Sequence, residues 1–65
     1  MTREEVDAYE GRRAKMVRAD GVIMVGVIRR DSLARFAIIG NFGHLIQYAH
    51  VAHIELASED TPFTD

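Results

Sequence analysis

The stretch that most constrains the fold of this chain is residues 44–56, HLIQYAHVAHIEL, in which apolar and polar residues roughly alternate. A period of two is typical of β-strands. It predicts one strand over Leu45–Tyr48 and a second over Val51–Leu56, with a tight corner at Tyr48–His50. Two strands this short cannot bury themselves, because an isolated pair is marginally stable in water. They must close a barrel, pair with another chain, or do both.

The side chains of these two strands sort into faces. Residues two apart on a strand point to the same side. Ile46 and Tyr48 therefore share one face of the first strand, and Ala52, Ile54 and Leu56 share one face of the second. We expect the larger apolar residues on these faces to be covered, either within the chain or by a neighbour.

The size of the chain favours oligomerisation. It has 65 residues, which is enough for one domain. A domain of this length buries only about 60% of its unfolded surface and is marginal alone. Small domains usually add disulfides, a metal or further copies of themselves. The chain has no cysteine, so disulfides and thiolate metal sites are excluded, and we expect no cofactor.

The three histidines do not predict a metal site. His50 and His53 lie three apart, and positions three apart on a strand face opposite sides. His44 lies at the start of the same stretch. No carboxylate or cysteine completes a ligand set around them.

A short helix is predicted at the N-terminus. Thr2 followed by Glu5 is a capping box, in which each side chain accepts from the other residue's backbone amide. Gly11 is the kind of residue that ends a helix. The predicted helix spans residues 3–11, and at this length it must pack on something else to be stable.

The middle of the chain predicts three further strands. Asp20-Gly21 between two apolar runs is a strong signal for a two-residue hairpin turn. Gly26 interrupts the second apolar run and predicts a bend. A further turn is expected over residues 29–32 and a loop over residues 40–43. The predicted strands are Ala14–Ala19, Val22–Ile28 and Arg35–Ile39.

Taken in order, these elements predict a mostly β fold. One short N-terminal α-helix and five strands in this length indicate a small, strongly bent, five-stranded SH3-like barrel over residues 1–57. Residues 58–65 contain Pro62 and several acidic residues, and we expect them to form a flexible acidic tail.

The charges are unevenly distributed along the chain. Residues 1–10 sum to −3 and residues 55–65 to −4, whereas residues 11–54 carry seven basic side chains against two acidic ones. A basic body between acidic ends is consistent with a polyanionic partner, and equally with a solvated surface. The seven basic residues are Arg12, Arg13, Lys15, Arg18, Arg29, Arg30 and Arg35.

Two segments resemble motifs of the Sm-like (LSm) superfamily and, within it, of the Hfq family of bacterial RNA chaperones. Residues 20–28, DGVIMVGVI, are similar to the family's hairpin and bent strand. Residues 41–54, NFGHLIQYAHVAHI, are similar to its second motif, in which a Tyr-Lys-His corner joins two short strands. The resemblance covers about residues 3–56. Ala49 stands where the Hfq corner has lysine, and the Sm-type Asp-x-x-x-Asn pattern is absent.

The resemblance implies a homo-oligomeric ring of five to seven subunits. In Sm-like proteins the fourth strand of one subunit pairs with the fifth strand of the next, which covers the open edges of the barrel. Such a head-to-tail contact closes into a ring when the rotation between subunits allows it. The interface residues implied here are Leu45, Ile46, Tyr48, Val51 and Ile54.

The resemblance also implies that the ring binds single-stranded RNA. Tyr48, His50 and Asn41 would lie at the pore, and Arg12 and Arg13 would lie at the rim. The family's base-stacking position falls on Leu33, Arg35 or Phe36, because residues 29–35 do not align without gaps.

Each of these residues also has a structural interpretation. Tyr48 is a candidate core aromatic, His50 a hydrogen-bonding corner residue, and Asn41 a turn former between Gly40 and Gly43. Arg12 and Arg13 form a solvated pair in that interpretation. An SH3-like assembly module that forms the same oligomer without RNA is therefore the alternative function.

Other classes of function find no support in the sequence. No nucleophile–base arrangement, pair of catalytic carboxylates or phosphate-binding glycine loop is present, so we do not expect an enzyme. No apolar run approaches the ~20 residues of a membrane span. The acidic segment MTREEVDAYEG lacks the pattern of a signal peptide, so a cytoplasmic protein that binds neither membrane nor DNA is expected.

Overall fold

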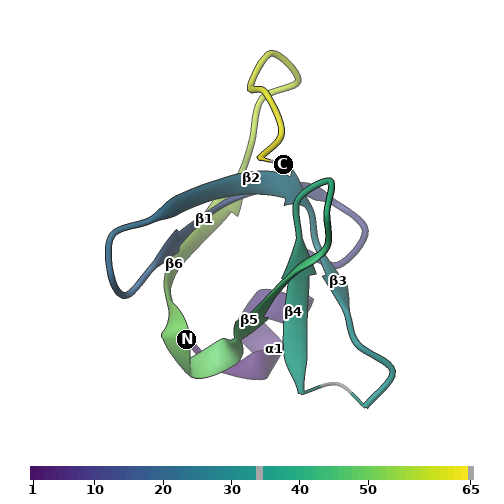
Figure 1. Cartoon of the computed structure of the whole chain (residues 1–65), viewed down its shortest axis with the longest axis vertical. Coiled ribbons are helices and arrows are strands. Elements are labelled where there is room, and N and C mark those ends of the chain that lie inside the picture. The colour runs from purple at the N-terminus through teal and green to yellow at the C-terminus, as the bar shows by residue number, and fades with distance from the viewer. Residues whose placement is uncertain (34, 65) are drawn as a thin grey trace.

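The computed structural model describes residues 1–33 and 35–64. These residues form a mostly β fold in which six strands build two three-stranded antiparallel sheets, in the orders β2-β1-β6 and β3-β4-β5 (Figure 1). Over this part of the chain the two sheets do not join into a closed barrel. The elements are α1 (Arg3–Asp7), β1 (Arg13–Arg18), β2 (Ile23–Val27), β3 (Arg29–Arg30), β4 (Phe36–Ile39), β5 (His44–Gln47), the 3₁₀ helix η1 (Tyr48–His50) and β6 (Val51–Leu56).

Helix α1 begins as predicted but ends four residues early. The Glu5 amide donates to Thr2 Oγ1 at 3.3 Å, and the Thr2 amide donates to Glu5 Oε1 at 3.2 Å, which confirms the capping box. Beyond Asp7 the backbone tightens into turns, and the Gly11 amide donates to the Ile28 carbonyl at 2.7 Å. The predicted end at Gly11 is wrong because this glycine already bonds to the sheet region.

One predicted strand and one predicted turn become two strands in different sheets. Ile28 alone separates β2 from β3, and Arg29 and Arg30 pair with β4 instead of forming a turn. The Ile28 side chain is 1% exposed, and its amide donates to the Arg12 carbonyl at 3.1 Å. Residues 1–33 and 35–64 therefore form six strands and not five, because the chain changes sheets at Ile28, two residues after the glycine where the bend was expected.

Gly26 lies where β2 passes very close to the loop between β4 and β5. A Cβ atom at this position would lie 2.8 Å from the Gly40 amide nitrogen and 3.3 Å from Ile39 Cγ1. A contact of 2.8 Å to backbone cannot be relieved by turning a side chain. The two sheets can pack at this distance only because residue 26 has no side chain.

A β-bulge in β6 changes which of its side chains reach the core. Val17 pairs with His53 and Arg18 pairs with Val51, so Ala52 is an extra residue without a partner on β1. Such an insertion shifts the alternation by one position. Val51 and Ile54 are consequently buried at 1% and 4% exposure, whereas Ala52 is exposed. The expectation that Ala52 shares the covered face of this strand is wrong.

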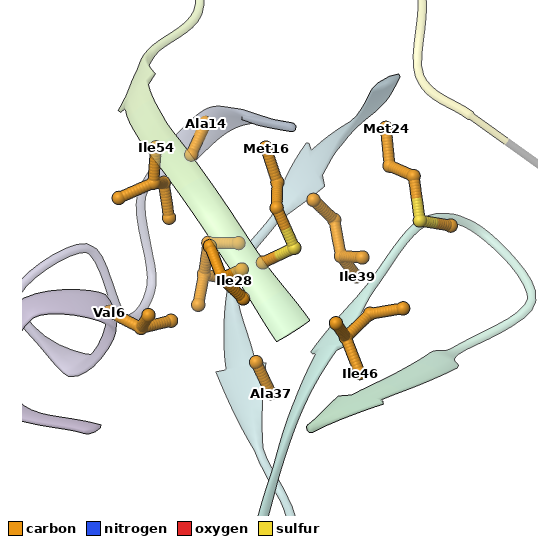
Figure 2. Packing of buried hydrophobic residues seen from close by; sticks show 10 residues of the cluster. Val6, Ala14, Met16, Met24, Ile28, Ala37, Ile39, Ile46 and Ile54 are labelled. Atoms are coloured by element: carbon orange, nitrogen blue, oxygen red, sulfur yellow. The ribbon is translucent and has the colours of Figure 1, made fainter. Parts of the chain in front are cut away.

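The core lies between the two sheets and receives one residue from α1. Figure 2 shows its side chains converging from Val6, from both sheets and from Ile28 at the change of sheets. Burying a valine, isoleucine or methionine side chain contributes about 1.5–3 kcal/mol to the stability of the fold. The clustered residues are Val6, Ala14, Met16, Met24, Ile28, Ala37, Ile39, Ile46, Val51 and Ile54.

Residues 58–64, predicted to belong to a flexible tail, return across β1 and β2. The Thr64 amide donates to the Val25 carbonyl at 2.8 Å, and the Arg13 guanidinium donates to backbone carbonyls of the segment. The flexibility of the segment stays a prediction, and Asp65 lies outside the described residues. None of the helices over residues 1–33 and 35–64 is both long and apolar enough to cross a membrane.

Candidate functional site

Four of the predicted RNA-contacting residues lie toward one end of the sheet β3-β4-β5. Tyr48 and His50 are in η1, directly after β5. Phe36 is the first residue of β4 and pairs with Gln47, the last residue of β5. The antiparallel register therefore brings Arg35 and Phe36 to the end of the sheet from which η1 starts. The structure places all four in one region, although they are up to 15 positions apart in the sequence.

Asn41 lies at the other end of β5. It belongs to the loop between β4 and β5, next to the pair formed by Ile39 and His44. The four residues of β5 separate it from η1, a distance of about 13 Å at 3.3 Å per residue. Its backbone amide donates to the Thr64 carbonyl at 2.9 Å. Within one chain, Asn41 is not brought together with Tyr48 and His50.

Tyr48 has a structural contact in this arrangement. Its hydroxyl donates to Asp7 Oδ1 at 3.0 Å, and its half-buried ring packs against the core. Burial, the hydrogen bond to Asp7 and the negative charge of Asp7 together raise the pKa of Tyr48 to about 12. The contact joins η1 to α1, so the core interpretation of Tyr48 that the sequence left open has a specific partner.

Asp7 is the centre of a small ion-pair cluster beside Tyr48. Its carboxylate Oδ2 lies 3.8 Å from Arg3 Nε and 3.5 Å from Arg30 Nη1. Arg30 Nε also lies 3.1 Å from Glu10 Oε2. The cluster connects α1 to β3. The sequence contained no signal that would identify Asp7 as the partner of Tyr48, which is 41 positions away.

His50 is exposed and lines an open pocket of about 250 Å³ with Arg18, Ala19 and Asp20. The pocket lies between η1 and the β1–β2 turn, where the Ala19 amide donates to the His50 carbonyl at 2.8 Å. Arg18 Nη2 lies 2.5 Å from Asp20 Oδ2. An imidazole and a guanidinium can both donate to a phosphate, but Asp20 competes for the guanidinium here.

The predicted basic pair at the rim is divided between two environments. Arg12 is exposed and makes no ion pair within the described part of the chain. Arg13 is partly buried, donates to three backbone carbonyls and lies 4.3 Å above the Phe63 ring centroid. The Ile28 amide donates to the Arg12 carbonyl, and Arg29 directly follows Ile28 in the sequence. Arg29, which the sequence did not single out, is exposed and also lacks an ion pair among residues 1–33 and 35–64.

Arg35 and Phe36 make contacts with their own neighbours. Arg35 Nε lies 3.8 Å from Asp31 Oδ2, and the guanidinium lies 5.8 Å from the Phe36 ring centroid. Arg35 and Leu33 are exposed, whereas Phe36 is half-buried. All three candidates for the base-stacking position thus retain some accessible surface.

The predicted interface residues are divided between core and surface. Leu45 is 59% exposed, whereas Ile46, Val51 and Ile54 are at most 6% exposed and belong to the core, and Tyr48 is half-buried. What β5 and β6 offer to another molecule is therefore their outer backbone edges. Over the described residues, β5 pairs only with β4 and β6 pairs only with β1.

In comparisons with known proteins, no family model, no curated protein and no solved structure matches this chain. The function is therefore argued from the residues of the chain and the geometry that they adopt.

Proposed function

We propose that this chain is an Sm-like subunit that assembles into a homo-oligomeric ring of five to seven copies and binds single-stranded RNA. The observation that carries the proposal is the pair of open sheet edges that flank η1, one on β5 and one on β6 beyond Val51. The Val51 carbonyl itself accepts from the Met1 ammonium at 2.8 Å. In Figure 1, η1 joins these two strands on the side of the fold that carries α1.

An open edge leaves a row of backbone amides and carbonyls that can accept another strand. β5 and β6 belong to different sheets, so pairing β5 of one copy with β6 of the next uses two different surfaces. A contact of this kind is head-to-tail, and it forms a ring if the rotation between copies closes. Leu45 at 59% exposure and Leu56 at 54% exposure lie on these two strands, and burying them would contribute to the same interface.

The proposed RNA site of each subunit consists of residues at the η1 end of the sheet. His50 and Arg35 supply donors, and Phe36 supplies an aromatic ring for stacking. Arg12 and Arg29 are exposed cations without ion pairs among the described residues and can contact phosphates. A ring repeats these contacts around one axis, so that individually weak contacts act together.

The assembly is tested by measuring mass in solution. We expect multi-angle light scattering to give five to seven times the mass of one chain at micromolar concentration. Leu45→Lys places a charge at the β5 edge and should shift the protein toward monomer. Leu33→Lys makes the same change at a residue that is 65% exposed and lies outside the strands, and it should leave the mass unchanged. A wild-type monomer would refute the ring.

RNA binding is tested separately with the assembled protein. Oligo-U, oligo-A and a mixed sequence are titrated at several salt concentrations, and the affinity should fall steeply as salt rises. His50→Ala should change the preference among the three RNAs more than the salt dependence, since base contacts carry specificity. If none of the three RNAs binds at low salt, the RNA part of the proposal is wrong.

One observation favours an assembly module without RNA as a second candidate. Arg3, Arg18, Arg30 and Arg35 are all paired with carboxylates of the same chain. Ala49 at the corner also offers no charge where the resembled family has lysine. This candidate predicts the same oligomeric mass with no RNA bound at any salt concentration.

A further inference from the structure

The outer edge of β2 is occupied by the chain's own C-terminal segment. β2 is the last strand of its sheet, so its outer edge is available to a further strand. The Val25 amide donates to Thr64 Oγ1 at 2.9 Å, and the Val25 carbonyl accepts from the Thr64 amide at 2.8 Å. Both backbone groups of Val25 are thus satisfied by a single residue 39 positions away.

The side chain of Arg13 on β1 binds backbone carbonyls of the same segment. Its Nε donates to the Ser58 carbonyl at 3.3 Å, and its Nη2 donates to the carbonyls of Glu59 and Thr61 at 3.0 Å each. The guanidinium also lies 4.3 Å from the Phe63 ring centroid. Carbonyl contacts recognise any peptide backbone, whereas the stacking contact requires a ring at position 63.

The loop between β4 and β5 supplies a third contact. The Asn41 amide donates to the Thr64 carbonyl at 2.9 Å. Thr64 is therefore bound through its amide, its hydroxyl and its carbonyl, by Val25 of β2 and by Asn41 of the β4–β5 loop. Proteins that bind peptides by strand addition use the same arrangement. A sheet edge hydrogen-bonds to the peptide backbone, and neighbouring groups select the side chains.

We propose that the outer edge of β2, with Arg13 and Asn41, is a binding site for an extended peptide, and that residues 58–64 of a second copy fill it by exchange with the chain's own segment. None of the three contacts depends on which copy supplies the segment. Exchange of an identical element between copies preserves every contact and therefore costs little. Ser58, Glu59 and Asp60 are exposed. The start of the segment, where it would have to separate from its own chain, is therefore not packed in the core. The proposal does not depend on pairing of β5 with β6 or on RNA.

The site is tested with a full-length acceptor chain whose own segment cannot dock. Phe63→Ala with Thr64→Pro removes the ring, the hydroxyl and the amide that the site uses. The probe is a synthetic peptide of residues 58–64, SEDTPFT, added to the ¹⁵N-labelled acceptor. We expect saturable shifts of the Val25 and Asn41 amide signals. Binding to the wild-type chain should be at least about tenfold weaker, because its site is open for a tenth of the time or less.

Two controls make the result specific. A peptide that carries the same two substitutions should cause no shifts in the acceptor. The single variant Phe63→Ala, which keeps the backbone contacts, replaces the double variant if circular dichroism shows that the double variant is unfolded. Absence of saturable binding to a folded acceptor would overturn the site, as would equal binding to acceptor and wild-type chains.

Exchange between copies is tested by adding unlabelled wild-type chain to the labelled acceptor. The Val25 and Asn41 signals should move in the same direction as with the peptide, with a dependence on concentration. If the peptide binds but the wild-type chain causes no shift, the segment acts only within its own chain and the exchange is refuted. A failed ring with successful exchange, or the reverse, separates this inference from the proposed function.

Discussion

At the scale of single residues, the structure depends on positions whose role is set by a distant backbone or carboxylate. Gly26 is required by the Gly40 amide, which a Cβ atom would approach to 2.8 Å. Tyr48 is positioned by Asp7, at 3.0 Å from its hydroxyl. The sequence marked both positions as unusual, since one is a glycine within an apolar strand and the other an aromatic residue at a corner.

We expect Gly26→Val to destabilise the fold by about 1–3 kcal/mol, because inserting atoms into a closely packed site forces the backbone apart. Gly26→Ala, which adds one carbon, should have a smaller effect in the same direction. Thermal unfolding followed by circular dichroism measures both. An unchanged midpoint for the valine variant would contradict the close approach of the two sheets.

Tyr48→Phe should lower the free energy of unfolding by about 1 kcal/mol, because the hydrogen bond to Asp7 is lost and its acceptor remains. The pH dependence is a second readout. The pKa of Tyr48 is raised from 10.0 to about 12 in the folded chain. The folded state therefore holds this proton more tightly, and the associated stability is complete below pH 10 and is lost as the pH rises toward 12.

The control for this measurement is the Phe variant itself, which lacks the ionising group at position 48. Chemical unfolding of both proteins between pH 9 and pH 12 should show the additional loss only in the wild type. Parallel curves would show that Tyr48 does not ionise differently in the folded chain.

At the scale of elements, the bulge in β6 lets two apolar residues that are three positions apart both face the core. Val51 and Ile54 are three apart and would face opposite sides of a regular strand. The unpaired Ala52 between them restores both to the inner side. The element is thus determined by its register against β1 as much as by its own residues.

Deletion of Ala52 should leave cooperative folding intact, because Val51 and Ile54 would then lie two positions apart, where a regular strand places both on its inner side. Ala52→Gly keeps the number of residues and should cost no more than about 1 kcal/mol. Urea unfolding monitored by circular dichroism compares the two. A deletion variant that no longer unfolds cooperatively would contradict the assignment of Ala52 as the extra residue in the register of β6 against β1.

At the scale of the whole molecule, the fold engages most of the basic side chains of the chain in contacts with its own residues. Arg3, Arg18, Arg30 and Arg35 are paired with carboxylates, and Arg13 is occupied by residues 58–63. Among the described residues, the cations that make no ion pair or hydrogen bond through their side chains are Arg12, Lys15 and Arg29.

The combined variant Arg12→Ala with Arg29→Ala should therefore weaken RNA binding for all sequences. The slope of log affinity against log salt should also become shallower, by about 0.7 for each phosphate that the variant no longer neutralises. Arg13→Ala is the matched control, and we expect a smaller effect because its guanidinium is already engaged. Fluorescence anisotropy with labelled RNA measures the slopes. A larger effect of Arg13→Ala would mean that residues 58–64 do not hold this side chain when RNA binds.

Much of the local structure could be predicted from the sequence because its signals are local. The capping box of Thr2 and Glu5 acts over three residues. A hairpin turn forms at Asp20-Gly21 as predicted, but its loop has three residues and not two, because the Arg18 amide donates to the Val22 carbonyl at 2.8 Å. The strand Val51–Leu56 has the predicted bounds, and the order of one short helix followed by strands is confirmed. For the candidate site the sequence indicated only the individual residues, and their separation into an η1 end and an Asn41 end required the register of β4 and β5.

By itself the sequence determined a mostly β chain without disulfides, with a capped N-terminal helix and a glycine required in its second strand. Only the tertiary structure decided the change of sheet at Ile28, the bulge at Ala52, the partner of Tyr48 and the docking of Thr64 on Val25. The physical reason is the range of the interactions. Caps and turns are formed by residues within four positions, whereas the bulge, the Tyr48 contact and the docking of Thr64 each join groups at least 33 positions apart. Which distant groups meet depends on packing the whole chain, and no local pattern specifies it.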